Sequence, residues 1–148
     1  MALRLSSGLK LGIMGTSTIK EMLNGGVLDL FTGSQPASSD YIETGTKLVR
    51  ISTSAGTHAT AGLLFGTSSS TGTLPKSASD WKGTVSVGGV AGWFRFYGTG
   101  GTTGTSGTAR RVDGAIGVSG ADLNLTHTSL DKDSTLTVNT FSLTQPTE

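Results

Sequence analysis

Short apolar runs separated by turn-rich links are the feature that most constrains the fold of this chain. The runs combine β-branched and aromatic residues with polar neighbours, and the links are rich in Gly, Ser and Thr. Thr suits strands and Gly suits turns and bulges, so the pattern predicts many short strands. The expected strands are residues 27–32, 47–53, 61–67, 83–87, 92–97, 110–118, 121–125 and 135–143.

The length of the chain fits one domain. Its 148 residues can bury a core without a disulfide or a metal, and the chain has no cysteine. The strand spacing favours an all-β fold, an antiparallel β-sandwich or a jelly roll. We expect this domain to span residues 26–148, after an extended N-terminal arm and one short helix in residues 1–25.

The N-terminal arm carries apolar residues at nearly alternating positions. They are Leu3, Leu5, Leu9, Leu11 and Ile13. Alternation of this kind predicts an extended segment with one apolar side. Such a segment needs a surface to cover it, so we expect these residues to contact a partner surface, in the same subunit or in a neighbouring one.

The one helix that we expect lies between Thr16 and Gly25. Thr18 and Glu21 have the spacing of a capping box. Its apolar face consists of Ile19, Met22 and Leu23. A helix this short has to dock on a sheet or on a neighbouring chain to be stable.

The strand at residues 92–97 has two different faces. Successive side chains of a strand point to opposite sides, and we assign Phe94 and Phe96 to the core. The other side is left for an interface or for a second sheet. It carries Trp93, Arg95 and Tyr97.

The last strand, residues 135–143, contains an irregularity. Leu136 and Val138 share one face, whereas Phe141 and Leu143 have the opposite parity. One straight strand cannot bury all four side chains on one side, so we expect a bulge near Asn139. The alternative is a strand that is buried on both faces.

Three links are long and polar, namely residues 33–40, 68–80 and 98–108. The third is almost entirely Gly and Thr, and we expect a mobile hairpin tip unless a neighbour orders it. It lacks the third Gly of a G-x-G-x-x-G motif, a Gly-Lys-Ser/Thr sequence and a following amphipathic helix. We therefore expect no phosphate site there.

Residues suited to catalysis or metal binding are few. His58 and His127 are the only histidines, whereas a catalytic metal site usually takes three protein ligands. No G-x-S-x-G nucleophile elbow occurs. Asp131 and Asp133 could bind calcium, but the Gly and Glu of an EF-hand loop are missing, so we expect a solvated turn. The sequence favours a protein that is not an enzyme, with no cofactor and no metal.

The charges are balanced and scattered, with a formal net charge of +1. No basic stripe favours nucleic acid, and we expect the adjacent Arg110 and Arg111 at a solvated strand edge. No apolar run reaches membrane-spanning length. Residues 11–15 are too short and too Gly-rich for a secretory core, so we expect cytosolic synthesis without export.

Three large aromatic residues support an alternative hypothesis, a sugar-binding surface. Aromatic faces on a β-sandwich can stack on sugar rings, and the candidates are Trp81, Trp93 and Tyr97. Few acidic or amide residues lie beside them in the sequence to bind sugar hydroxyls. We favour the interpretation that they anchor the core or an interface.

Sequence segments that resemble one protein family are spread over nearly the whole chain. The most specific part is Gly-Val-Ser-Gly-Ala-Asp-Leu-Asn-Leu at residues 117–125, joined to the strand at 135–143. Further parts lie at residues 2–5, 33–38, 45–49, 91–97 and 112–116. Together they resemble the small structural proteins in virions of tailed bacteriophages. The size and all-β character are similar to those of capsid decoration or cement proteins.

The resemblance implies a structural role in a virion. A decoration protein binds the major capsid protein, stabilises the shell and self-associates as a dimer or trimer. It lies on the capsid exterior after synthesis in the bacterial host cytoplasm. The apolar arm and the face of Trp93, Arg95 and Tyr97 are then the candidate interface residues. A tail, neck or baseplate component and a receptor-binding or glycan-binding virion module are the alternatives.

Overall fold

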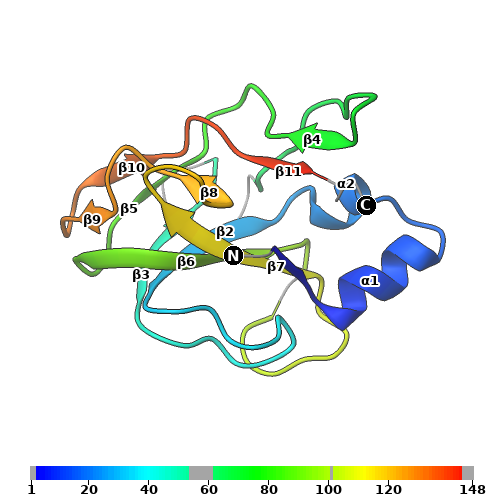
Figure 1. Cartoon of the computed structure of the whole chain (residues 1–148), viewed down its shortest axis with the longest axis horizontal. Helices are drawn as coiled ribbons and strands as arrows, with labels where there is room; N and C mark the ends of the chain where they lie inside the picture. The colour runs from blue at the N-terminus through cyan, green and yellow to red at the C-terminus, as the bar shows by residue number, and fades with distance from the viewer. Residues whose placement is uncertain (1–2, 54–61, 101, 145–148) are drawn as a thin grey trace.

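The structure is a computed structural model that describes residues 3–53, 62–100 and 102–144. The described chain is mostly β, which confirms the predicted all-β class (Figure 1). Its elements are β1 (Arg4–Leu5), α1 (Ser7–Met14), α2 (Ile19–Leu23), β2 (Val27–Thr32), β3 (Lys47–Ile51), β4 (Thr73–Pro75), β5 (Lys82–Thr84), β6 (Gly89–Tyr97), β7 (Arg111–Gly117), β8 (Leu123–Asn124), β9 (Ser129–Leu130), β10 (Thr135–Thr137) and β11 (Ser142–Thr144).

A seven-stranded sheet forms the first layer of the fold. Its main path is β1-β7-β6-β2-β3, while β8 pairs with β7 and β9 pairs with β6. All of these pairs are antiparallel except β7 with β8. The second layer consists of the two-stranded sheets β5–β10 and β4–β11, which lie across one face of the first (Figure 1). The arrangement is sandwich-like.

Aromatic rings fill the space between the two layers. Phe94 and Phe96 point from β6 into the core, as the sequence predicts, and both are fully buried. Phe141 lies opposite them, and its ring centroid is 5.5 Å from those of Phe94 and Trp81. Phe65 completes the cluster with an edge contact to Trp81 at 5.4 Å. Trp81 is therefore a core anchor.

The predicted last strand is broken into two. β10 pairs with β5 and β11 pairs with β4, so the two halves belong to different sheets. The break between them replaces the single bulge that we expected. After the break, odd-numbered residues point into the core, whereas before it the even-numbered residues do. All four side chains in question are buried in the core, namely Leu136, Val138, Phe141 and Leu143.

The prediction of an extended arm is wrong beyond Leu5. β1 pairs with β7, and Ser6 then caps a helix by accepting a hydrogen bond from Leu9 N–H at 3.2 Å. Leu9 lies on this helix and is fully buried. At Gly8, a Cβ would lie 2.1 Å from the carbonyl oxygen of Thr108, so the helix packs closely on that loop.

The remaining predictions of elements have mixed outcomes. Helix α2 is confirmed with its capping box, in which Thr18 and Glu21 bond each other. Within the predicted strand at residues 61–67, of which residue 61 lies outside the described residues, Leu63 and Phe65 form only isolated bridges. Strand β4 lies in the predicted link at residues 68–80, and β9 lies between two predicted strands; each is too short to show a period.

We predict that Phe141→Ala destabilises the protein by about 3–5 kcal/mol, because it leaves a cavity among four aromatic rings. Urea unfolding followed by tryptophan fluorescence measures the loss. The matched control is Ser142→Ala, next in sequence but exposed, which should change the free energy of unfolding by less than about 0.5 kcal/mol. Equal losses in the two variants would contradict this packing.

Candidate functional site

A row of alternating charges crosses the sheet on the face opposite the aromatic core. In register across five strands it runs Arg4, Asp113, Arg95, Asp29 and Arg50. Each carboxylate thus lies between two arginines. Directly opposite residues on neighbouring strands have Cβ atoms about 5 Å apart, close enough for their side chains to pair.

Two pairs of neighbouring residues in this row form bidentate ion pairs. Arg95 donates from Nε and Nη2 to the two carboxylate oxygens of Asp113, both at 2.7 Å. Arg50 donates in the same way to Asp29, both at 2.6 Å. Asp29, Arg95 and Asp113 are each at most 1 % exposed. Buried charges persist only when they are paired and hydrogen-bonded, and both conditions are met here.

Aromatic side chains flank the charged row. Trp93 stacks on Phe31 with ring centroids 4.5 Å apart, and the guanidinium of Arg95 lies 5.4 Å from the Trp93 ring. On the other side of the row, the guanidinium of Arg111 lies 5.7 Å from the ring of Tyr97. These cation–π contacts add to the pairing of the arginines.

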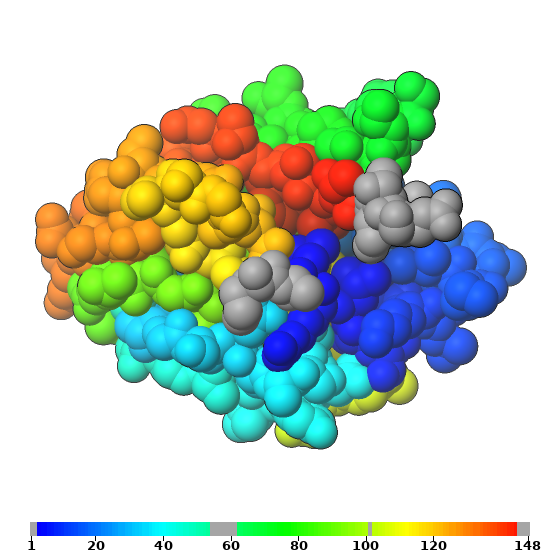
Figure 2. Space-filling view, in the orientation of Figure 1, coloured from blue at the N-terminus to red at the C-terminus, as the bar shows by residue number. Residues whose placement is uncertain are grey.

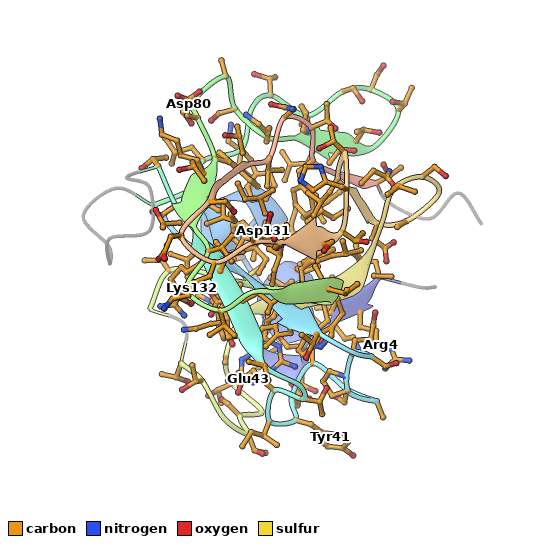
Figure 3. The ribbon with its side chains drawn as sticks, turned by 90° about the vertical axis from the view of Figure 1, so that its left-hand side faces the viewer. Arg4, Tyr41, Glu43, Asp80, Asp131 and Lys132 are labelled. Atoms are coloured by element: carbon orange, nitrogen blue, oxygen red, sulfur yellow. The ribbon has the colours of Figure 1, made fainter. Side chains whose placement is uncertain are left out.

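Two loops cover this face. They connect β2 to β3 and β6 to β7, and Glu43 in the first loop joins them. Its carboxylate accepts hydrogen bonds from the Tyr97 hydroxyl at 2.7 Å, from Arg95 at 3.1 Å and from the N–H of Gly104 in the second loop at 3.0 Å. Figure 3 shows Glu43 and Tyr41 on this side of the sheet, at the end of the molecule away from Asp80.

Backbone carbonyls of the loops accept hydrogen bonds from side-chain N–H groups that do not bond a carboxylate. Arg95 donates to Tyr41 at 2.9 Å, and the Trp93 indole N–H donates to Thr44 at 3.2 Å. Arg111 donates to Ser39 at 3.2 Å, and it also bonds the carbonyl of Thr102. The loops are therefore tied to the sheet by its own charged side chains.

The ionisation of the network follows from these contacts. Burial raises the pKa of Glu43, but the bonds from Tyr97 and Gly104 and the charge of Arg95 outweigh it, so its pKa is lower than usual. Burial and the bond to Glu43 raise the pKa of Tyr97, which stays protonated. Burial and then the nearby Arg95 lower the pKa of Arg111. The network thus holds its charges at neutral pH.

The three predicted interface residues of β6 are not on the surface. Trp93, Arg95 and Tyr97 are at most 2 % exposed, because the two loops of the same chain lie over them. The expectation that this face stays open for a partner is therefore wrong. A sugar-binding role loses its aromatic platform as well, since Trp81 is also fully buried.

The predicted residues of the N-terminal arm fall into two groups. Leu3 and Leu5 are partly buried against the core, and Leu9 is fully buried. Leu11 and Ile13 lie on α1 with exposed fractions of 76 % and 37 %, and Met14, which we did not single out, is 85 % exposed. Of the five predicted arm residues, the two near the end of α1 are therefore the ones exposed to a partner.

The other residues considered in the sequence are dispersed. Asp131 and Asp133 lie in an exposed turn, where Asp133 has a positive φ of 67°. His127 is exposed and bonds the Thr126 hydroxyl through Nδ1 at 3.2 Å, and His58 lies outside the described residues. Arg111 is fully buried, so the expected solvated edge is wrong for this residue. Among the described residues no three His, Cys, Asp or Glu side chains form a group suited to a metal ion.

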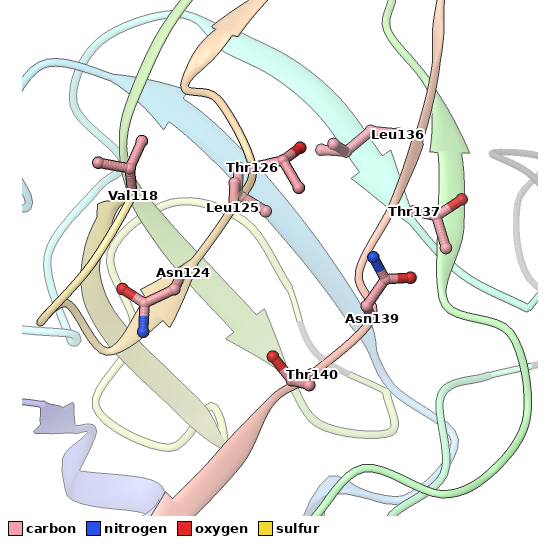
Figure 4. Close-up of a pocket in the computed structure, with 8 residues that line it drawn as sticks. All are labelled: Val118, Asn124, Leu125, Thr126, Leu136, Thr137, Asn139 and Thr140. Atoms are coloured by element: carbon pink, nitrogen blue, oxygen red, sulfur yellow. The ribbon is translucent and has the colours of Figure 1, made fainter.

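A shallow hollow of about 240 Å³ lies between the end of β8 and the end of β10 (Figure 4). Asn124, Leu125 and Thr126 line one side, and Leu136, Thr137, Asn139 and Thr140 line the other, with Val118 at the rim. None of these side chains is ionisable. The hollow is suited to an uncharged occupant and offers no acid or base.

The comparisons with known proteins give no relative. No protein-family model, curated protein or solved structure matches the chain. In the part of the chain that the structure describes, no helix is long and apolar enough to cross a membrane.

Sequence reasoning missed the charged row, although the signal is present. One charged residue stands near the middle of each apolar strand, in Leu-Asp29-Leu, Val-Arg50-Ile, Phe-Arg95-Phe and Val-Asp113-Gly. Their signs alternate only once the order of the strands is known. A search for opposite charges inside apolar strands would have found them.

We predict that Asp113→Asn lowers the free energy of unfolding by about 3–5 kcal/mol, because it removes the bidentate carboxylate of the buried Arg95 and leaves it the single bond to the Glu43 carboxylate. The control is Asp80→Asn, which breaks an exposed pair with Lys82 at 3.4 Å and should cost less than about 1 kcal/mol. Chemical denaturation of both variants makes the comparison. Similar losses would contradict a buried, tightly paired Arg95.

We further predict that Glu43 contributes to acid sensitivity. Because folding lowers its pKa, ionised Glu43 stabilises the folded state above its unfolded pKa of about 4.3 and stops doing so as pH falls through the lower folded value. Glu43→Gln should be less stable at pH 7 and should lose less stability than wild type on acidification below about pH 4.5. Asp131→Asn, which changes an exposed carboxylate, should show the wild-type dependence of the free energy of unfolding on pH. The same pH dependence in all three proteins would contradict the role of Glu43.

Proposed function

We propose that this protein is a structural protein of a tailed-phage virion and acts as a capsid decoration or cement protein. It binds the major capsid protein on the capsid exterior, stabilises the shell and self-associates as a dimer or trimer, after synthesis in the host cytoplasm. The resemblance of residues 117–125 and 135–143 to small phage virion proteins supports this proposal. The observation that supports a binding role is the exposed apolar end of α1, which can serve as the binding surface.

Helix α1 has the properties of a docking element. Leu11 and Met14 are 76 % and 85 % exposed on a helix that is itself anchored by the buried Leu9. Large apolar side chains that are exposed close together are more costly in water than scattered ones and often mark an interface. The helix projects from the side of the sheet (Figure 1), where a neighbouring subunit has access to it.

The rigid body behind the helix suits the same role. Bidentate ion pairs and loop contacts fix the covered face, and the aromatic cluster fixes the other. A rigid protein loses little conformational entropy when it binds, so weak contacts repeated over many copies add up to a firm attachment. A cement protein requires this behaviour, whereas a catalytic site is not needed.

We predict a simple ratio between this chain and the major capsid protein in purified particles, measured by quantitative mass spectrometry. A ratio near one, or a simple fraction of one, is expected for a protein distributed over the shell. A very small ratio would reject the decoration role and favour the tail, the neck or the receptor-binding apparatus.

The same particles test the docking helix. Leu11→Asp with Met14→Asp should reduce the amount of bound protein at least about tenfold, because two charges would be buried at the contact. The control is Val90→Asp, an apolar residue that is 61 % exposed near the start of β6, whose opposite end pairs with Arg111 next to the N-cap of α1. Equal occupancy of the two variants would exclude α1 as the docking element.

A further inference from the structure

The strand β10 has one free edge. The N–H of Val85 donates to the carbonyl of Ser134 at 2.9 Å, and the N–H of Val138 donates to the carbonyl of Trp81 at 2.8 Å. Backbone groups of alternate residues in a strand point to opposite edges, so Ser134, Leu136 and Val138 bond toward β5. The backbone groups of Thr135 and Thr137 therefore point away from β5.

A second backbone segment faces this edge across the hollow of Figure 4. The N–H of Leu125 donates to the carbonyl of Gly117 at the end of β7, at 2.9 Å. The backbone N–H and C=O of the next residue, Thr126, therefore do not point toward β7. Within the described ranges, no backbone hydrogen bond involves Thr126, Asn139 or the outward groups of β10. Two unpaired stretches of backbone thus line one hollow.

The hollow continues along β10. A neighbouring hollow of about 290 Å³ shares Thr126, Leu136, Thr137 and Asn139 with the first. It extends past Ser134 and is also lined by the ionisable side chains His127 and Asp131. Together the two hollows form a groove along the free edge. In Figure 2 the yellow and orange segment that carries β8 lies beside the red C-terminal segment. Outward groups at Thr135, Thr137 and Asn139 would pair with a guest of about five residues.

We propose that this groove, between residues 124–126 and the free edge of β10, binds an extended peptide segment of another protein, uncharged where it crosses the first hollow, by adding it as a strand. Unpaired N–H and C=O groups at a sheet edge are a template for such pairing. The first hollow has no ionisable lining residue, and Leu125, Leu136 and Val118 supply apolar contacts for one guest side chain. The inference does not depend on the virion role.

A single strand fits this groove better than the sheet edge of a second copy. If β10 of another copy paired here, its own β5 would have to occupy the place of residues 124–126, because β5 lies directly beside β10. A guest with no neighbouring strand avoids this clash. Chain termini and extended linkers of a partner protein have that property.

The probe for the test is the capped peptide acetyl-Thr-Val-Thr-Val-Thr-amide, titrated into the ¹⁵N-labelled protein. Amide resonances of residues 124–126 and 134–140 should shift, and the Thr135 and Thr137 amides should become protected from hydrogen exchange. The control peptide carries N-methyl groups on alternate amides, so that one of its edges cannot donate, and should bind about tenfold more weakly. Absence of these shifts at millimolar peptide would overturn the proposal.

The protein variants Thr137→Pro and Thr137→Val separate pairing from side-chain effects. Proline removes the outward N–H of residue 137 and none of the bonds to β5, so it should weaken peptide binding about tenfold. Valine keeps the N–H and should bind as wild type does. If the proline variant fails to fold, the N-methylated peptide still decides the question. Equal peptide binding by both folded variants would reject strand addition. The same amide shifts in a separate titration with maltotriose would reject it too.

Discussion

The alternating charges across the sheet are the constraint on which the rest of this structure depends. Asp29 and Asp113 are buried in the middle of a sheet, and each binds the guanidinium of an arginine on a neighbouring strand. The guanidinium groups have more donors than two carboxylates can accept, so carbonyls from the covering loops bind the others. The long loops after β2 and β6 are therefore part of the sheet's electrostatics, although their sequences resemble simple linkers.

The two faces of the sheet make its register strict. A slip of one residue in β6 would place Arg95 among the aromatic rings of the core and move Phe94 and Phe96 to the ionic face. Both changes bury groups in the wrong surroundings. The pairing of charges and the packing of rings thus select the same alignment of strands, and agreement of this kind between levels favours a single native state.

The sequence predicted those parts of the fold that local patterns determine. Residues 27–32 form the predicted strand β2, and Thr18 with Glu21 forms the predicted capping box. The errors arise where distant residues decide. The N-terminal leucines alternate, but Ser6 caps a helix because its hydroxyl also contacts Ala109 and Arg111, more than 100 residues away.

The outward residues of β6 show the same limit on the candidate site. Their alternation shows that Trp93, Arg95 and Tyr97 share a face, and nothing local shows that the chain covers that face itself. The free edge of β10 was equally hidden, since it follows from which neighbours the strand has. Strand order and loop placement are long-range properties, and a single sequence carries them only through complementary charges and shapes.

The ion pairs also bear on how the sheet assembles as the chain is synthesised. Asp29 and Arg50 are 21 residues apart on adjacent strands, and Arg95 and Asp113 are 18 apart on the next adjacent pair. Each hairpin can therefore neutralise its own charges before the two hairpins meet along β2 and β6. Docking then joins two hairpins whose central carboxylates are already paired, and the early half need not hold a bare carboxylate while the ribosome completes the later one.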